Sequence, residues 1–106
     1  MDAPIVTLLG STKFKKEFEE TNQRLTVRGF VVLSLGVFSQ ADELIVSEKT
    51  KDVLVEVHKQ KIRMADWVYV IDPNGYIGES TKSEIEYAKS LGKKIRYLSQ
   101  RIVWAA

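Results

Sequence analysis

The sequence predicts an α/β protein with a flavodoxin-like or Rossmann-like three-layer sandwich. Short apolar runs alternate with segments of helical spacing along the whole chain. Each run is apolar at consecutive positions rather than at every second one, which is typical of strands buried on both faces. Together these two observations indicate a parallel sheet covered by helices on both sides.

The first strand and the first helix follow from the opening residues. The run PIVTLL at 4–9 contains β-branched residues and stops at Gly10, which predicts a buried strand. A helix is expected next, with Ser11 or Thr12 as its N-cap. Gly29 is expected to end this helix.

The middle of the chain predicts a strand, a loop and a helix. FVVLS at 30–34 indicates the second strand, and residues 35–50 have no clean period, so they are expected to form a long loop with at most one helical turn. Loops of this length in small domains are often functional. A helix is expected at 51–66, and its inward-facing residues would be Val53, Leu54, Val57, Ile62 and Ala65.

The last part predicts two strands around a third helix. The strands are expected at 67–72 and 94–99, and the helix at 81–92. The apolar tail at 100–106 could add a fifth strand, pack on a helix or meet another subunit.

Right-handed crossovers limit the possible topologies. The expected strand order is 2-1-3-4, or 2-1-3-4-5 if the tail adds a strand. This order places a topological switch point between the first and third strands. Ligands bind in such sheets beyond the carboxyl ends of the strands at that point. The segments GSTKF at 10–14 and DPNGYIGESTKSE at 72–84 should therefore converge there.

The length and amino-acid composition of the chain exclude several kinds of site. The 106 residues are enough for one domain, 1–106. The absence of cysteine excludes disulfides and a thiol nucleophile, and a single His argues against a His-rich metal site. No metal or organic cofactor is expected. A domain of this size buries only about two-thirds of its unfolded surface, which favours a homodimer or higher homo-oligomer.

Charge and targeting signals narrow the partners. The formal charge of +2 is too balanced to suggest a nucleic acid polymer as the main partner. The densest basic cluster, Lys89, Lys93, Lys94 and Arg96, fits a solvated face near a helix end. Neither a signal peptide pattern nor an apolar run of about 18 residues is present, which predicts a cytoplasmic protein without a membrane partner.

Both converging loops open helices and are rich in small and hydroxyl residues. Unpaired N–H groups at a helix start bind anions, so the loops suit a phosphate or a sugar. The alternative is ordinary turn and cap chemistry. Neither loop is a Walker loop or a dinucleotide fingerprint, which disfavours ATP hydrolysis and NAD. The candidate binding residues are Gly10, Ser11, Thr12, Lys13, Gly78, Ser80 and Thr81.

Glu84 has two interpretations. Thr81 and Glu84 have the spacing of a capping box, in which the Glu folds back onto the backbone N–H of the cap residue. Alternatively, the carboxylate faces the crevice at the switch point and attacks an electrophilic carbon.

Three other residues also have a structural and a functional interpretation. Asp72 begins the turn sequence Asp-Pro-Asn-Gly, yet it could also handle protons. His58 lies on or beside the buried stripe of its helix, either as a core His or as a proton donor. Tyr76 is either a surface aromatic or a stacking wall for a base.

Three segments resemble the nucleoside 2-deoxyribosyltransferase superfamily, which includes 2′-deoxynucleoside 5′-phosphate N-hydrolases. They are LLGST at 8–12, HKQKIRMADWVYVID at 58–72 and GYIGESTKSEIEYAKSLGKKI at 75–95. The resemblance covers nearly the whole chain except 35–50. It implies that Glu84 is the nucleophile that attacks C1′ of the sugar and forms a glycosyl-enzyme.

The sequence departs from the family pattern at several positions. The family motif reads E-[IL]-G-x-A, and Glu86 replaces its glycine. His58 stands where many members have a catalytic Asp, and Thr7 stands where an aromatic residue is common. Family members lend carboxy-terminal groups to the site of a neighbouring subunit. Because this chain is short, its sequence does not show a counterpart of those groups.

The sequence therefore predicts an enzyme that cleaves or transfers the N-glycosidic bond of a (deoxy)nucleoside or nucleoside 5′-monophosphate. Glu84 would attack, and His58, with Asp72 as a possible partner, would handle protons. The first alternative is a non-catalytic nucleotide-binding sensor on the same scaffold. The second is an interaction module that uses the tail and the 35–50 loop.

Overall fold

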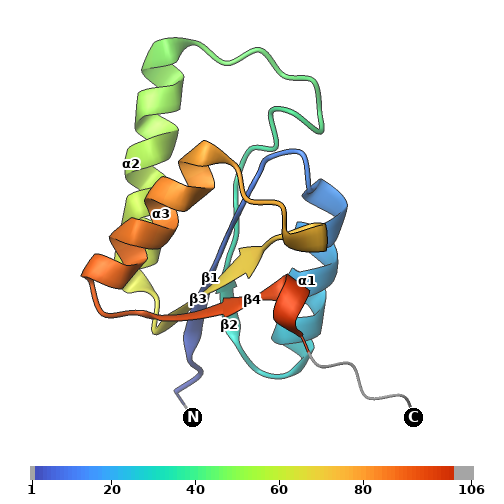
Figure 1. Cartoon of the computed structure of the whole chain (residues 1–106), viewed down its shortest axis with the longest axis vertical. Coiled ribbons are helices and arrows are strands. Elements are labelled where there is room, and N and C mark those ends of the chain that lie inside the picture. Colours follow the sequence, from blue (N-terminus) through green and yellow to red (C-terminus); the bar gives the residue numbers. More distant parts are fainter. Residues whose placement is uncertain (1, 102–106) are drawn as a thin grey trace.

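The computed structural model describes residues 2–101, which form a four-stranded parallel sheet with helices on both faces (Figure 1). The order β2-β1-β3-β4 and the three-layer α/β class confirm the sequence prediction. The possible fifth strand falls on the tail, where residues 102–106 lie outside the described part of the chain. The strands are β1 (Ile5–Gly10), β2 (Val31–Leu33), β3 (Trp67–Ile71) and β4 (Lys94–Tyr97). The helices are α1 (Lys15–Val27), α2 (Glu48–Met64) and α3 (Glu79–Ser90), and two 3-10 turns are η1 (Pro73–Gly75) and η2 (Leu98–Gln100).

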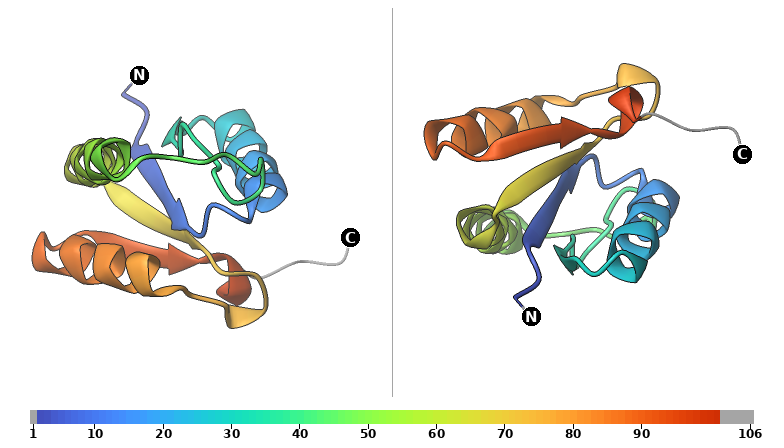
Figure 2. Two further views of the ribbon diagram at one scale, coloured as in Figure 1. Left: turned by 90° about the horizontal axis from the view of Figure 1, so that it is seen from above. Right: turned by 90° about the horizontal axis from the view of Figure 1, so that it is seen from below.

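The two faces of the sheet carry separate cores. Figure 2 shows α2 and α3 on one face and α1 on the other. Successive residues of a strand point to opposite faces, so the fully apolar strands supply both cores. One core joins Leu9, Ile62, Ala65, Val68, Val70, Ile85 and Ala88, and the other joins Val6, Leu8, Phe18, Leu25, Tyr69 and Ile71.

Gly10 lets the tips of β1 and β3 approach closely. It pairs with Ile71 at the carboxyl end of β3. A Cβ at position 10 would lie 2.9 Å from the Ile71 carbonyl oxygen and 3.0 Å from Phe18 Cε1. A side chain there would clash, so glycine is required for packing at this edge of the sheet.

Two helix starts differ from the prediction. The N-cap of α1 is Phe14, without a side-chain hydrogen bond, so the prediction that Ser11 or Thr12 caps this helix was wrong. Helix α2 begins three residues earlier than predicted because Ser47 caps it, its Oγ accepting a 3.2 Å hydrogen bond from the Thr50 N–H.

The inward face of α2 also differs from the prediction. Val53 and Val57 are about half exposed, at 54% and 47%, so their assignment to the core was wrong. The amino-terminal part of α2 extends past the sheet and past α3, and so has no sheet to pack on (Figure 1). The buried residues of α2 are His58 and Ile62, in the part of the helix that packs on the sheet. Within residues 2–101, no helix combines the length and the apolar character needed to cross a membrane.

Candidate active site

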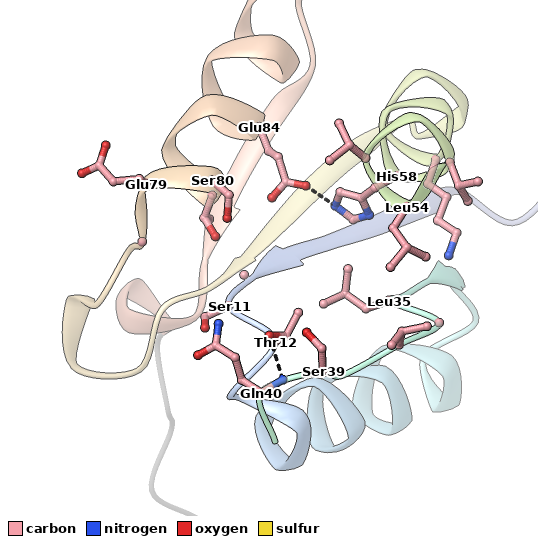
Figure 3. A pocket seen from close by; sticks show the side chains of 18 of the residues that line it. Ser11, Thr12, Leu35, Ser39, Gln40, Leu54, His58, Glu79, Ser80 and Glu84 are labelled. Atoms are coloured by element: carbon pink, nitrogen blue, oxygen red, sulfur yellow. Dashed lines mark hydrogen bonds and ion pairs between the residues drawn. The ribbon is translucent and has the colours of Figure 1, made fainter. Parts of the chain in front are cut away.

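A cavity of about 480 Å³ lies at the carboxyl ends of β1 and β3, where the switch point was predicted (Figure 3). Its walls are the β1–α1 loop, residues 35–40 after β2, the middle of α2 and the start of α3. Glu84 and His58 line it, as do all the predicted binding residues except Lys13, namely Gly10, Ser11, Thr12, Tyr76, Gly78, Ser80 and Thr81. The two loops that were expected to converge therefore share one cavity.

Glu84 points into this cavity rather than back onto its own helix. Helix α3 begins at Glu79 with Gly78 as N-cap and no side-chain cap, so Thr81 lies inside the first turn. The capping box between Thr81 and Glu84 is therefore not formed. Instead, Glu84 Oε2 lies 2.9 Å from His58 Nε2, and the Glu84 side chain is 25% exposed (Figure 3).

His58 is buried on α2 and faces Glu84 across the cavity. The residue is 6% exposed, and within residues 2–101 neither ring nitrogen has a hydrogen bond of good geometry. The 2.9 Å contact is thus short enough for an ion pair, but the ring N–H is not well aligned with the carboxylate. A buried imidazole without a well-formed hydrogen bond is able to give its proton to a bound molecule.

The start of α3 offers donors to an anion. Because Gly78 provides no side chain, the first N–H groups of α3 have no side-chain acceptor from the cap. Thr81 lines the cavity and is buried, and its Oγ1 has no hydrogen-bond partner among residues 2–101. Ser80 adds a second hydroxyl. These N–H and hydroxyl groups fit a phosphate or sugar oxygen.

The opposite wall is the loop after β2, which is tied to the start of α1. Thr12 Oγ1 accepts a 3.3 Å hydrogen bond from the Gln40 N–H, and the Thr12 carbonyl accepts one from Ala41. Lys15 Nζ donates to both carboxylate oxygens of Asp42, at 2.9 and 3.0 Å. This hydrogen-bonded pair raises the pKa of Lys15 above its ordinary value. Through its two hydrogen bonds to residues 40 and 41, Thr12 holds this wall in place, and it also lines the cavity.

Tyr76 and Lys13 form one unit at the rim. Tyr76 lines the cavity and packs edge-on against Phe14, with ring centroids 5.6 Å apart. Lys13 Nζ lies 3.5 Å from the centroid of the Tyr76 ring, and Lys13 is not among the lining residues. The structure thus places the predicted phosphate-binding Lys13 on the aromatic ring.

Asp72 lies apart from the cavity. It is 3% exposed, and its carboxylate accepts two hydrogen bonds from Ser99, one from the N–H at 2.9 Å and one from the hydroxyl at 2.7 Å. These bonds join the end of β3 to η2. The structure does not bring Asp72 together with Glu84 and His58.

Lys61 and Glu79 also line the cavity, and sequence reasoning did not single them out. Lys61 Nζ donates a 2.7 Å hydrogen bond to the Ser34 carbonyl, which connects α2 to the end of β2. Lys61 is three residues after His58, a spacing that places both on one helix face. This spacing could have indicated from the sequence that Lys61 also lines the site. Gln40 belongs to the loop whose sequence has no clean period, so it could not be assigned in advance.

Comparison with known protein families identifies a family for this chain. None of the curated proteins compared with the chain matches it. A family model described as a domain of unknown function (DUF4406) matches residues 6–97, from β1 to the end of β4. The matched region includes both loops of the cavity and the helices that carry His58 and Glu84. The chain therefore belongs to the DUF4406 family.

Proposed function

We propose that this protein cleaves or transfers the N-glycosidic bond of a (deoxy)nucleoside or nucleoside 5′-monophosphate. The observation that carries the proposal is the position of Glu84, whose carboxylate lies in the switch-point cavity beside a buried His58. The resemblance to nucleoside 2-deoxyribosyltransferases, which the sequence suggests, supplies the reaction class.

The first half of the reaction uses both residues. A Glu84 carboxylate oxygen attacks C1′ of the sugar, and a C1′–O bond forms as the C1′–N bond to the base breaks. The electron pair of that bond stays on the base nitrogen, which takes a proton from His58. The ionised carboxylate also stabilises the positive charge that develops on the sugar.

The second half releases the sugar. Water, or the nitrogen of a second base, attacks C1′ and displaces the Glu84 carboxylate, while the now neutral His58 accepts the proton of the attacking group. The sequence leaves open which acceptor is used, so hydrolase and transferase are both included. His58 contacts Glu84 directly, so a substrate has to enter between them before the proton can reach the base.

The remaining walls fit the other parts of such a substrate. The N–H groups and hydroxyls at the start of α3, with Ser80 and Thr81, suit a 5′-phosphate or sugar hydroxyls. Gly10 and Ser11 bring backbone to the same space from β1. Tyr76 provides an aromatic surface at the rim for a base.

Base release from a panel of deoxynucleosides, ribonucleosides and their 5′-monophosphates, followed by chromatography, tests the proposal. Glu84→Gln is expected to abolish release, and His58→Gln to lower it by about 10²–10⁴-fold as for loss of a general acid. Glu86→Gln, the same change on the exposed side of α3, is the matched control and should remain active. A wild-type protein that releases no base from any substrate, or a fully active Glu84→Gln variant, would contradict the proposal.

A second candidate is a non-catalytic sensor for nucleotides. It is favoured by the direct contact of His58 with Glu84, because the carboxylate already has a side-chain partner within the protein. A sensor would bind a nucleotide tightly in calorimetry without releasing base. If the protein is instead an interaction module, no nucleotide should raise its melting temperature.

We further propose that the protein acts in the cytoplasm as a homodimer or higher homo-oligomer. Exposed apolar side chains on and just before α2 support this, namely Leu44, Ile45, Val53, Val55 and Val57. A second copy placed on this surface would also cover the cavity, which Val55 and Val57 line. Analytical ultracentrifugation distinguishes the states, and a Val53→Glu variant should shift the protein toward monomer.

A further inference from the structure

A second groove, of about 660 Å³, lies on the α1 face of the sheet, away from the proposed active site. It lies over β3 and β4, between the end of α1 and η2. Figure 2 shows that α1 and η2 share this face while α2 and α3 lie on the other. Among residues 2–101, α1 is therefore the only α-helix on this face, and the part of the sheet near β4 is left uncovered.

The groove gathers most of the arginines of the protein. The chain has five arginines, and four of them line the groove, as do Lys94 and four aromatic residues. No Asp or Glu is among the lining residues that the structure describes. The four arginines are Arg24, Arg28, Arg96 and Arg101, and the aromatic residues are Phe30, Trp67, Tyr69 and Tyr97.

These cations contrast with several lysines of α2 and α3. Within residues 2–101, none of the five forms an ion pair. On α2 and α3, by contrast, Lys51, Lys82 and Lys89 each pair with a carboxylate one turn away. Charges on the helices are thus largely compensated, whereas the groove has an excess of positive charge.

The fold separates the members of the basic cluster Lys89, Lys93, Lys94 and Arg96, and this separation creates the excess of positive charge in the groove. Lys93 donates to two backbone carbonyls, those of Arg63 and Ala65, and Lys89 stays on α3 with Glu86. Lys94 and Arg96 alternate with residues that pack on the α3 face, so they project from the groove side of β4. The net charge of +2 is an average that conceals this local patch.

An aromatic row forms the floor between the cations. Phe30 and Trp67 pack edge-on with centroids 5.6 Å apart, and Trp67 lies 5.9 Å from Tyr69. Arg24 Nη2 donates a 3.1 Å hydrogen bond to the Tyr69 hydroxyl, which fixes one guanidinium at the edge of the row. Trp67 is the partly exposed member on β3, opposite Lys94 in the register.

We propose that this groove binds single-stranded nucleic acid, with phosphates on the basic side chains and a base stacked at Trp67. Arginine recognises phosphate through two parallel hydrogen bonds, and aromatic side chains stack on bases of any sequence. Five cations exceed the charge of one nucleoside monophosphate, so a strand with several phosphates matches them better. A duplex keeps its bases stacked inside and cannot reach the aromatic floor with them. This inference is independent of the proposed glycosidic chemistry.

The test uses the full chain with Trp104→Phe, so that Trp67 is the only tryptophan. Quenching of its fluorescence by single-stranded (dT)10 at low salt measures binding, and repetition at rising salt gives the slope of log K against log[salt]. Arg28→Glu with Arg96→Glu removes two exposed groove cations. Lys16→Glu with Lys89→Glu makes the same net charge change on exposed residues outside the groove. Circular dichroism melts confirm that both double variants fold.

The expected result is saturable quenching that the groove variant weakens by about a hundredfold, because each of the two charge-assisted phosphate contacts contributes roughly a factor of ten. Its salt slope should fall by about 1.4, the value for two phosphate contacts on a single strand. The control variant should bind nearly as the parent does. Absence of binding at low salt, equal weakening by both variants, or tighter binding of a nucleoside triphosphate, heparin or duplex than of (dT)10 would overturn the proposal.

Discussion

Asp72 allows a direct test of whether a buried carboxylate that the sequence suggested for proton transfer is structural or catalytic. It is 3% exposed and accepts hydrogen bonds of 2.9 and 2.7 Å from the N–H and hydroxyl of Ser99. Hydrogen bonds to a charged group contribute about 1.5–3 kcal/mol each. Because Ser99 is exposed, water can replace the lost acceptor, so Asp72→Ala should lower the free energy of unfolding by about 2 kcal/mol. This corresponds to a Tm decrease of roughly 10 °C for a domain of this size.

Urea unfolding followed by circular dichroism measures this change. Asp52→Ala, an exposed Asp on α2, is the matched control and should stay within about 0.5 kcal/mol of wild type. A double-mutant cycle with Ser99→Ala should show strong coupling, because both changes remove the same contact. In the base-release assay that tests the proposed function, the folded Asp72→Ala variant should match the wild type at 20 °C. Unchanged stability, or a hundredfold loss of rate in a folded variant, would refute the structural assignment.

Three further substitutions probe the packing and charge around the cavity. Gly10→Ala should lower the free energy of unfolding by about 2 kcal/mol in urea, because its Cβ would lie 2.9 Å from the Ile71 oxygen; unchanged stability would contradict this close approach. Thr81→Val should raise the free energy of unfolding by about 1 kcal/mol, since the buried Oγ1 has no partner in the described chain; a less stable variant would mean that the hydroxyl is satisfied. The Asp42 hydrogen bond raises the pKa of Lys15, so its stabilisation should be complete below about pH 10 and lost as pH rises through the raised pKa. Asp42→Asn should remove this alkaline dependence in thermal melts, and a dependence that persists would argue against the pair.

The fold was predictable because burial on two faces leaves a simple pattern. Consecutive apolar residues in β1 and β3 indicated strands covered on both sides, and the handedness of crossovers limited the topologies, among which the expected order 2-1-3-4 is the one observed. Helix starts were harder, because several residues of a loop offer similar caps. Ser47 formed a cap that was not considered, whereas Ser11 and Thr12 formed none.

The site was predictable in its place but only partly in its members. The switch point located the cavity, and Glu84 and His58 meet there because the sheet brings α2 and α3 together. Asp72 and Lys13 looked equally suitable in sequence, but their partners Ser99 and Tyr76 lie too far along the chain to be inferred. Local sequence shows what a side chain can do, whereas distant residues decide what it contacts.

The contact between Glu84 and His58 spans two helices, so its length depends on how both helices sit on the sheet. Ile62 lies one turn after His58, and Ile85 and Ala88 lie on the inner side of α3; all three are buried in one core. Enlarging a side chain of that core, for example with Ala88→Val, should shift α3 relative to α2 and so lengthen the distance between the Glu84 carboxylate and the His58 ring without changing either residue. If these two side chains act as proposed, a core residue that does not line the cavity would then influence the reaction.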